Sequence, residues 1–325
     1  DTPIPYLHRP TGTIGFATME ELFERFADRP EELMVLSVNE QTRQPEWTPV
    51  QGLFRHKFTG QMLQTAQKWG VIETTPNHAL YDREMKLFRP IEMREIMAVR
   101  NIPIVWTPAR EVKLEIEALV EGKDERWIVQ PREGWARLAL PRYATQIKVH
   151  YRLPEDAEDL NALLTLIAWY VAEGHVNGDN GGVVISCSDP EQLERIREAY
   201  QRVTTAKGYI DKGAKTDSTW RLYLGSEAIR ELLVSLCGKG AANKRLPDFV
   251  FTLPRYYIEH LWAELMKADG SRIPPKLAVS ESYRACYFDY RTVSPMLAAQ
   301  IGFLASLLGM DYSVHLWKRT DGKKD

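Results

Sequence analysis

Two segments of the chain close a mostly apolar run of helical length with an acidic residue followed by glycine. The first run ends at Glu173 and Gly174, and the second ends at Asp269 and Gly270. Glycine directly after a periodic apolar run is typical of a left-handed helix cap, so both carboxylates are expected in the last turn of a helix. The helix dipole already concentrates negative charge there, and two carboxylates brought together would repel each other.

A divalent cation would resolve this repulsion if the two helix ends met. Hard ions such as Mg²⁺ take oxygen ligands and often use only one or two protein carboxylates. The alternative, for each helix taken alone, is a core helix whose acidic end points separately to water. The order of the elements after each helix favours the first interpretation.

The same order of elements comes after both acidic residues. A strand at 183–187 leads to a helix at 191–203, which Asp189 caps with Pro190 in its first position. Further strands at 209–212 and 219–224 and a helix that begins at Ser226 complete this copy. After Gly270 come a strand at 283–290, a helix at 296–308 that Ser294 caps, and a strand at 312–318. Neither copy could bury its apolar helix alone, so the two copies are expected to pack on one another.

The first hundred residues have a different pattern. Thr18 and Glu21 form a capping box that opens a short amphipathic helix ending near Phe26. Short apolar segments then alternate with turns, and they predict strands at 34–38, 47–50, 52–57, 71–74 and 79–81. This region is expected to be a small, mostly β module.

Composition sets the broad class of the protein. The 325 residues are 44% hydrophobic, which suits a large core and two domains. The net charge of −2 gives no sign of nucleic-acid binding by the chain as a whole. Three cysteines without CxxC spacing argue against a disulfide framework and a structural zinc site. No signal peptide or membrane-spanning run is present, so we expect a cytoplasmic, prokaryotic-type protein that does not contact a membrane.

The paired acidic motifs resemble those of the LAGLIDADG homing endonucleases in their single-chain, pseudo-symmetric form. Residues 166–174 and 262–270 resemble the two motifs, 244–247 resemble the Lys-x-x-Pro block, and 290–294 resemble the stretch before the last helix. The resemblance covers about residues 160–319. It implies an α+β domain in which two saddle-shaped antiparallel sheets straddle the DNA major groove, and in which the motif helices lie side by side.

The resemblance also implies the site. Glu173 and Asp269, with the adjoining Gly174 and Gly270, would form the site for Mg²⁺ or another divalent metal and, with Lys244 and Lys318, the catalytic centre. The alternative for each lysine is a solvated surface cation. One residue departs from the pattern, because Glu264 stands where the family has a small residue at the helix crossing. Its carboxylate must swing outwards or find a partner.

DNA contacts are expected from outward-facing strand residues and from loops. The candidates on strands and near their ends are Arg221, Tyr223, Arg284, Arg291, His315 and Arg319, and the candidates for phosphate contacts in loops are Lys212 and Lys215. The expected partner is double-stranded DNA with a long asymmetric target site, bound by a monomer.

The N-terminal blocks resemble an intein, a splicing domain of the Hint type. Residues 1–4, 36–39 and 75–81 match its first blocks in order. The resemblance implies that Thr75 and His78 polarise the upstream peptide bond, and histidine can give a proton to a leaving nitrogen near neutral pH. Two departures stand against splicing by this chain, because it begins at Asp1 without the initial Cys or Ser, and no penultimate His and terminal Asn come after residue 318.

These resemblances predict a Hint-like module at 1–105, a joining segment at 106–150 and a LAGLIDADG endonuclease domain at 151–325. The first hypothesis is a metal-dependent, site-specific DNA endonuclease that is encoded within an intein. A host protein would flank this intein on both sides. The second is a splicing or self-cleaving domain whose endonuclease is a passenger. The third is a DNA-binding module that has lost cleavage. The carboxylates at both motif ends favour the first.

Overall fold

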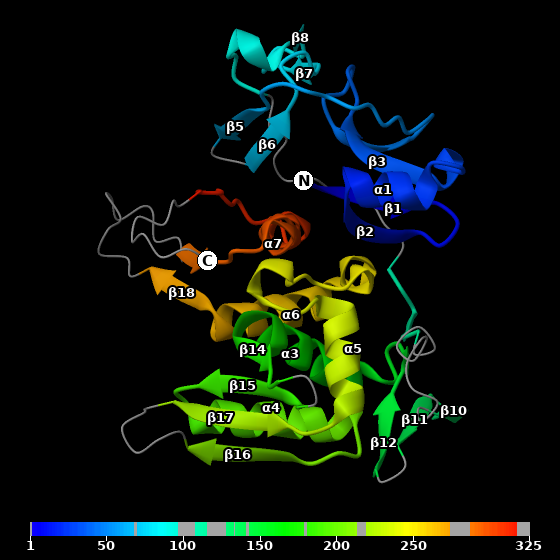
Figure 1. The fold of residues 1–325 in the computed structure, drawn as a ribbon, viewed down its shortest axis with the longest axis vertical. Coiled ribbons are helices and arrows are strands. Elements are labelled where there is room, and N and C mark those ends of the chain that lie inside the picture. The colour runs from blue at the N-terminus through cyan, green and yellow to red at the C-terminus, as the bar shows by residue number, and fades with distance from the viewer. Residues whose placement is uncertain are drawn as a thin grey trace. The chain divides into compact units, whose positions relative to one another are not determined.

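The computed structural model describes residues 2–67, 70–96, 108–115, 128–132, 134–140, 143–178, 181–212, 219–273 and 287–316. The chain divides into two compact units. Unit 1 comprises Asp1–Trp106 and Ala299–Asp325, and unit 2 comprises Thr107–Ala298. Both units combine helices with antiparallel sheets, as expected for an α+β protein (Figure 1).

Unit 1 is built around a four-stranded antiparallel sheet with the strand order β2-β1-β3-β4. Its strands are β1 (Pro3–His8), β2 (Thr13–Thr18), β3 (Leu33–Val38) and β4 (Pro45–Pro49). Two small hairpins come next, formed by β5 (Leu63–Gln67) with β6 (Gly70–Thr74), and by β7 (Leu80–Tyr81) with β8 (Leu87–Phe88). The short 3₁₀ helices are η1 (Pro30–Glu32) and η2 (Pro90–Glu92).

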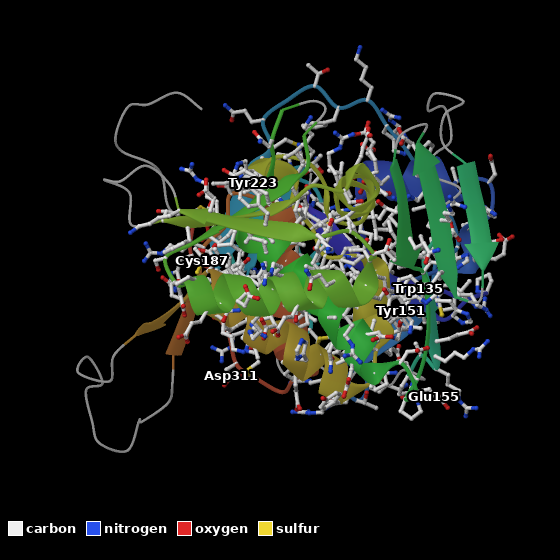
Figure 2. The ribbon with its side chains drawn as sticks, turned by 90° about the horizontal axis from the view of Figure 1, so that it is seen from below. Trp135, Tyr151, Glu155, Cys187, Tyr223 and Asp311 are labelled. Carbon is white, nitrogen blue, oxygen red and sulfur yellow. The ribbon has the colours of Figure 1, made fainter. Side chains whose placement is uncertain are left out.

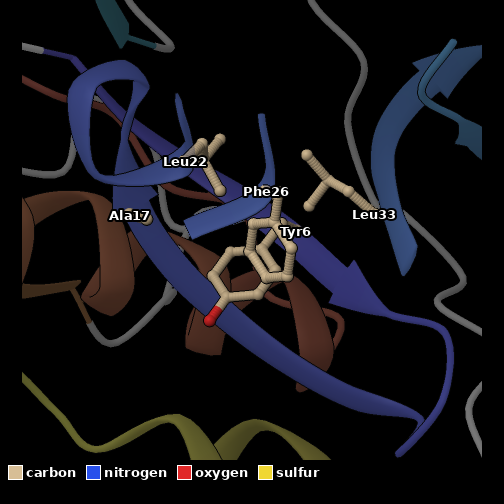
Figure 3. Close-up of a cluster of buried hydrophobic side chains, with 5 residues drawn as sticks. All are labelled: Tyr6, Ala17, Leu22, Phe26 and Leu33. Atoms are coloured by element: carbon tan, nitrogen blue, oxygen red, sulfur yellow. The ribbon is translucent and has the colours of Figure 1, made fainter. Parts of the chain in front are cut away.

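Helix α1 (Met19–Phe26) covers this sheet. Its predicted capping box is confirmed, since the Thr18 hydroxyl accepts from the Glu21 amide while the Glu21 carboxylate accepts from the Thr18 amide. The apolar face of the helix completes a buried cluster with the sheet (Figure 3), formed by Tyr6, Ala17, Leu22, Phe26 and Leu33.

Unit 2 begins with short strands and continues with the helices that carry the acidic motifs. Strands β9 (Glu111–Lys113) and β13 (His150–Arg152) pair with each other, and β10 (Ile128–Arg132), β11 (Trp135–Leu140) and β12 (Tyr143–Lys148) form a three-stranded antiparallel sheet. The next elements are α3 (Ala157–Glu173), β14 (Gly174–Val176), β15 (Val183–Cys187), α4 (Pro190–Val203), β16 (Gly208–Lys212), β17 (Trp220–Leu224) and α5 (Glu227–Cys237).

The second copy of the repeat comes after two 3₁₀ helices, η3 (Ala241–Asn243) and η4 (Asp248–Thr252). It contains α6 (Arg255–Ala268), β18 (Gly270–Ile273), β19 (Tyr287–Tyr290) and α7 (Pro295–Leu307). The first copy forms a four-stranded sheet, β14-β15-β17-β16, and the second contributes the hairpin β18-β19. Helix α7 begins in unit 2 and ends in unit 1, where Phe303 packs edge-on against Phe16.

Helix α3 is the centre of unit 2. Eleven of its seventeen residues are buried, from Leu160 to Val171, because α4, α5, α6 and strand β15 surround it. A helix that is apolar on all sides is typical of such a central position. The helix caps predicted at Asp189 and Ser226 are confirmed, and Ser294 accepts from the Leu297 amide at the start of α7.

Three expectations about the elements differ from the structure. Residues 52–57 and the described part of 312–318 do not form strands, because a strand needs a hydrogen-bonding partner and local apolar alternation does not supply one. The predicted joining segment contributes β9 to β12 to unit 2, and residues 299–325 group with unit 1. Among the described residues, no helix has the length and apolar character that crossing a bilayer requires.

Candidate functional site

Helices α3 and α6 meet along a series of polar side-chain pairs. The Asn161 amide donates to the Tyr256 hydroxyl at 3.3 Å, and Trp169 Nε1 donates to Glu264 Oε2 at 3.1 Å. Between them, Thr165 Oγ1 lies 3.0 Å from the Nε2 atom of His260. Each pair joins residues that are 95 positions apart, and each step along the series advances four residues on both helices.

This constant spacing determines how the two helices are aligned. Because both partners advance in the same direction, α3 and α6 run parallel, and residues four apart lie on one face of a helix. The next step in the series places Glu173 opposite Ala268, next to Asp269. The parallel arrangement therefore brings the two acidic helix ends to the same level.

The glycines after the two carboxylates have a role that differs from the expected left-handed cap. Gly174 has φ −84° and ψ 142°, and it begins strand β14. A Cβ atom at Gly174 would lie 2.6 Å from the Tyr170 Cα atom, and one at Gly270 would lie 2.6 Å from the Met266 carbonyl oxygen. The expectation of a left-handed cap at these positions was wrong. Glycine is required because the chain passes too close to the preceding helical turn for any side chain.

The two carboxylates are close enough for their charges to interact. Burial raises the pKa of Glu173, and the negative charge of Asp269 raises it further. Burial likewise raises the pKa of Asp269. Both side chains nevertheless remain accessible to solvent at the ends of their helices. The structure thus holds two carboxylates together at a place where their negative charge is disfavoured, and a cation would stabilise it.

Lys244 is buried beside these helix ends, with only 5% of its surface exposed. Its Nζ atom donates to the Tyr170 carbonyl oxygen at 2.6 Å and lies 3.0 Å from the centroid of the Tyr170 ring. Burial lowers the pKa of Lys244 to about 8. The Ser294 hydroxyl donates to the Lys244 carbonyl oxygen at 2.6 Å, which ties this segment to the start of α7. The alternative of a solvated surface cation therefore does not apply to Lys244.

A pocket opens beside Asp269. Its lining includes Tyr170, Gly174, Lys244, Asp269 and Tyr290. Burial, followed by the charges of Asp269 and Glu173, raises the pKa of the Tyr290 phenol, which therefore keeps its proton near neutral pH. An acidic residue (Asp269), a basic residue (Lys244) and an uncharged tyrosine (Tyr290) thus line one pocket at the end of α3.

Glu264, which stands where a small residue was expected, has three hydrogen-bond partners. Only 1% of it is exposed, and its carboxylate accepts hydrogen bonds from Trp169 of α3, Arg195 of α4 and Lys267 of its own helix. Burial alone would raise the pKa of Glu264, but these three hydrogen bonds hold it below its usual range. The buried charge therefore joins three helices near their crossing.

The outer face of the four-stranded sheet carries part of the predicted DNA-binding set. Alternation places Leu222 and Leu224 of β17 against the core and Arg221 and Tyr223 on the opposite face. Tyr223 stacks on the exposed Tyr209 of β16, with ring centroids 5.2 Å apart, and it is labelled in Figure 2.

Lys212 ends strand β16, which confirms the strand predicted at 209–212, whereas its assignment to a loop was wrong. It pairs with Trp220 in the strand register, and its Nζ atom lies 5.6 Å from the centroid of the indole ring. Alternation places both on the face opposite to Arg221. The structure therefore separates Lys212 from the two other candidates of this sheet.

The remaining candidates belong to both units. Arg291 is exposed and donates to Asp289 at 2.9 Å, and His315 lies in unit 1, with its Nε2 atom 3.2 Å from Ser313 Oγ. Thr75 and His78 form a turn in unit 1, in which the His78 amide donates to the Thr75 carbonyl oxygen at 3.1 Å. Four candidates lie outside the described residues, namely Lys215, Arg284, Lys318 and Arg319.

Two features of the site were not expected from the sequence. Two of the three partners of Glu264, Arg195 and Trp169, lie 69 and 95 positions away in the chain, so no local pattern indicates them. Tyr290 is opposite Gly270 in the β18–β19 pairing, but the chain between these strands is too long for its spacing to predict that register. In the described part of the chain, no group of three or more His, Cys, Asp or Glu side chains could hold a metal ion, so a cation here would rely on the carboxylate pair.

Comparison with known proteins places a family match on the first copy of the repeat. The LAGLIDADG-like domain family matches residues 161–236, which run from α3 to the end of α5. Two relatives come from Thermococcus. A DNA polymerase of Thermococcus hydrothermalis is 27% identical over 158 residues, covering 47% of this chain and 9% of the relative. The DNA polymerase II large subunit of Thermococcus kodakarensis is 27% identical over 152 residues, covering 44% of this chain and 8% of the relative.

A third relative matches more of the chain. The replication factor C small subunit of Methanocaldococcus jannaschii is 28% identical over 301 residues, covering 83% of this chain and 14% of the relative. The chain therefore spans less than a sixth of the length of each of these curated relatives. A LAGLIDADG-like domain is thus present in unit 2, and it includes the helix that carries Glu173.

Proposed function

We propose that unit 2 is a metal-dependent, site-specific endonuclease that cuts double-stranded DNA. The observation that carries the proposal is the pair of solvent-accessible carboxylates, Glu173 and Asp269, at the ends of two parallel helices. Burial and, after it, the negative charge of Asp269 raise the pKa of Glu173. A LAGLIDADG-like domain in the same unit agrees with this function.

The donor set fits a hard cation. Two carboxylates with room for water molecules suit Mg²⁺, which usually keeps several waters in its coordination shell. A bound Mg²⁺ would lower the pKa of water and neutralise charge on the phosphate. Glu173 and Asp269 would hold the ion, while Gly174 and Gly270 let the chain turn away directly after each ligand.

The other residues would bind and orient the DNA. The hydrolysis forms one bond between the oxygen of water and phosphorus and breaks one phosphodiester bond, while solvent takes up one proton and supplies another to the leaving oxygen. Lys244, which is mostly protonated at pH 7, would stabilise negative charge that develops on the phosphate. Arg221 and Tyr223 would contact DNA along the outer face of the sheet.

The test uses the purified full chain and a duplex made by joining the two sequences that flank its coding segment. With Mg²⁺ the wild-type protein should cut this duplex, and chelation should stop the cutting. Glu173→Gln and Asp269→Asn should each slow cutting at least about 100-fold, because each removes one ligand charge. Both variants should still bind the duplex in a gel-shift assay.

A matched control lies on the same helix as Asp269. Glu259→Gln changes an exposed carboxylate that pairs with Arg255 at the other end of α6, and it should cut like the wild type. Binding without cutting by the wild type would support the third hypothesis, a DNA-binding module. Normal cutting by both ligand variants would remove the carboxylate pair from the mechanism.

A second function is favoured by the relatives. A DNA polymerase large subunit and a replication factor C small subunit carry different names, yet each shares with this chain a segment that is a small part of its length. A segment shared in this way is expected of an insertion that occurs in different host proteins. We infer that unit 1, with the turn of Thr75 and His78, belongs to an intein that splices itself out of such a host.

A further inference from the structure

The strand after each acidic motif places one residue beside the motif glycine. In the first copy Gly174 pairs with Ile185, and in the second copy Gly270 pairs with Tyr290. The two positions are equivalent in the repeat, since each lies opposite the residue directly after a carboxylate. Any difference between Ile185 and Tyr290 is therefore a difference between the two halves of one site.

The first copy shows that packing alone needs no polar group at this position. Ile185 is fully buried and apolar. Tyr290 instead has a hydroxyl group that is buried but has no hydrogen-bond partner in the described part of the chain. A buried polar group without a partner destabilises a fold, so such groups are uncommon unless they bind something else.

The surroundings of Tyr290 indicate what the hydroxyl could bind. The Tyr290 residue lines the pocket that also contains Asp269 and Lys244. After burial, the charges of Asp269 and Glu173 raise the pKa of its phenol. Neither carboxylate accepts a hydrogen bond from the Tyr290 hydroxyl, although the charges of both reach it. The unused donor therefore belongs to a side chain that lines the pocket beside Asp269 and Lys244.

We propose that Tyr290 is a further catalytic residue, whose hydroxyl donates a hydrogen bond to a non-bridging oxygen of the scissile phosphate. The inference rests on the proposed endonuclease function of unit 2. Tyr290 neither gains nor loses a proton during the reaction, since its part is to stabilise charge on the phosphate. A neutral donor can approach the two carboxylates without adding a further negative charge to the site.

The test is Tyr290→Phe, which removes only the oxygen atom. The metal-free variant should unfold at the same temperature as the wild type or at a higher one, because an unpaired buried hydroxyl is lost. Its single-turnover cutting of the duplex that joins the flanking sequences should fall at least about 10-fold. Binding of that duplex in Ca²⁺ should stay within about twofold of the wild type, because most DNA contacts lie elsewhere.

Tyr151→Phe is the matched control. Tyr151 is also buried in unit 2, but its hydroxyl donates to the Lys148 carbonyl oxygen at 2.9 Å. Its loss should lower the unfolding temperature and leave cutting unchanged. A lower unfolding temperature for Tyr290→Phe, or cutting at the wild-type rate, would overturn the inference. An inactive wild-type protein would instead contradict the proposed function, and the unfolding temperatures would still show whether the hydroxyl is unpaired.

Discussion

Lys244 shows how one residue is placed by its surroundings. Its side chain passes over the Tyr170 ring and ends on the carbonyl oxygen of the same residue, in the last turn of α3. Lysine is rarely buried, since its charge loses the stabilisation of water. The residue is therefore destabilising in its charged form, and its presence beside the carboxylate pair suits a functional role.

The stability of the protein should depend on pH through Lys244. Burial lowers its pKa from 10.5 to about 8, so between these values the unfolded chain binds more protons than the folded chain. The free energy of unfolding therefore rises with pH across this window, and below the window Lys244 makes no contribution to its pH dependence. The gain should be about 3 kcal/mol across the full window.

The measurement compares wild type with Lys244→Met by urea denaturation between pH 7.5 and 9.5. The stability of the wild type relative to the variant should rise steadily with pH over this range. Cys237, whose pKa burial raises to about 12, also affects stability at alkaline pH, but it is present in both proteins and cancels in the difference. A difference that does not change with pH would show that Lys244 is solvated.

At the scale of elements, the series of polar pairs between α3 and α6 determines where the carboxylates of Glu173 and Asp269 lie. Each pair restricts sliding of one helix along the other, because a shift by one residue would separate all three pairs. Glu264 is almost fully buried, and it links α3, α4 and α6 through Trp169, Arg195 and Lys267. Removing it should loosen the contact one turn before Glu173 and Asp269.

Glu264→Ala should lower the free energy of unfolding of unit 2 by about 2–3 kcal/mol. Breaking a buried ion pair usually costs more, but Arg195 and Lys267 are partly exposed and can be solvated again. The main loss is the acceptor for the buried Trp169 N–H group. Urea denaturation measures the change, and Glu259→Ala on the exposed side of α6 should lie within about 0.5 kcal/mol of the wild type. Equal effects of the two variants would show that the Glu264 network contributes nothing specific.

The same elements show which features a sequence can predict. The helices, their caps at Thr18, Asp189 and Ser226, and the strand at 183–187 depend on neighbours a few residues away, and the structure confirms them. The strands predicted at 52–57 and at 312–318, which are absent from 52–57 and from the described part of 312–318, depend on a partner strand that local alternation cannot supply. The contacts of Glu264 with Trp169 and Arg195 and the register of Tyr290 depend on tertiary packing, so the sequence indicated the carboxylate pair and Lys244 but not these other parts of the site.

At the scale of the whole molecule, the two proposed activities belong to different units. The carboxylate pair and its pocket lie in unit 2, whereas the turn that contains Thr75 and His78 lies in unit 1. The relative from Methanocaldococcus jannaschii aligns with 83% of this chain, so its similarity extends beyond the residues matched by the LAGLIDADG-like domain. Cutting and splicing should therefore respond to different substitutions.

This separation can be tested by expressing the chain, with its natural flanking residues, between two marker proteins. We expect a ligated product of the two markers, and His78→Ala should reduce its yield at least about 10-fold because the general acid is lost. The same variant should cut DNA at the wild-type rate, whereas Glu173→Gln should splice normally and fail to cut. His56→Ala, at another exposed histidine of unit 1, is the control and should do both. If His78→Ala impaired cutting as strongly as splicing, the two activities would depend on one another and the assignment of each to its own unit would be wrong.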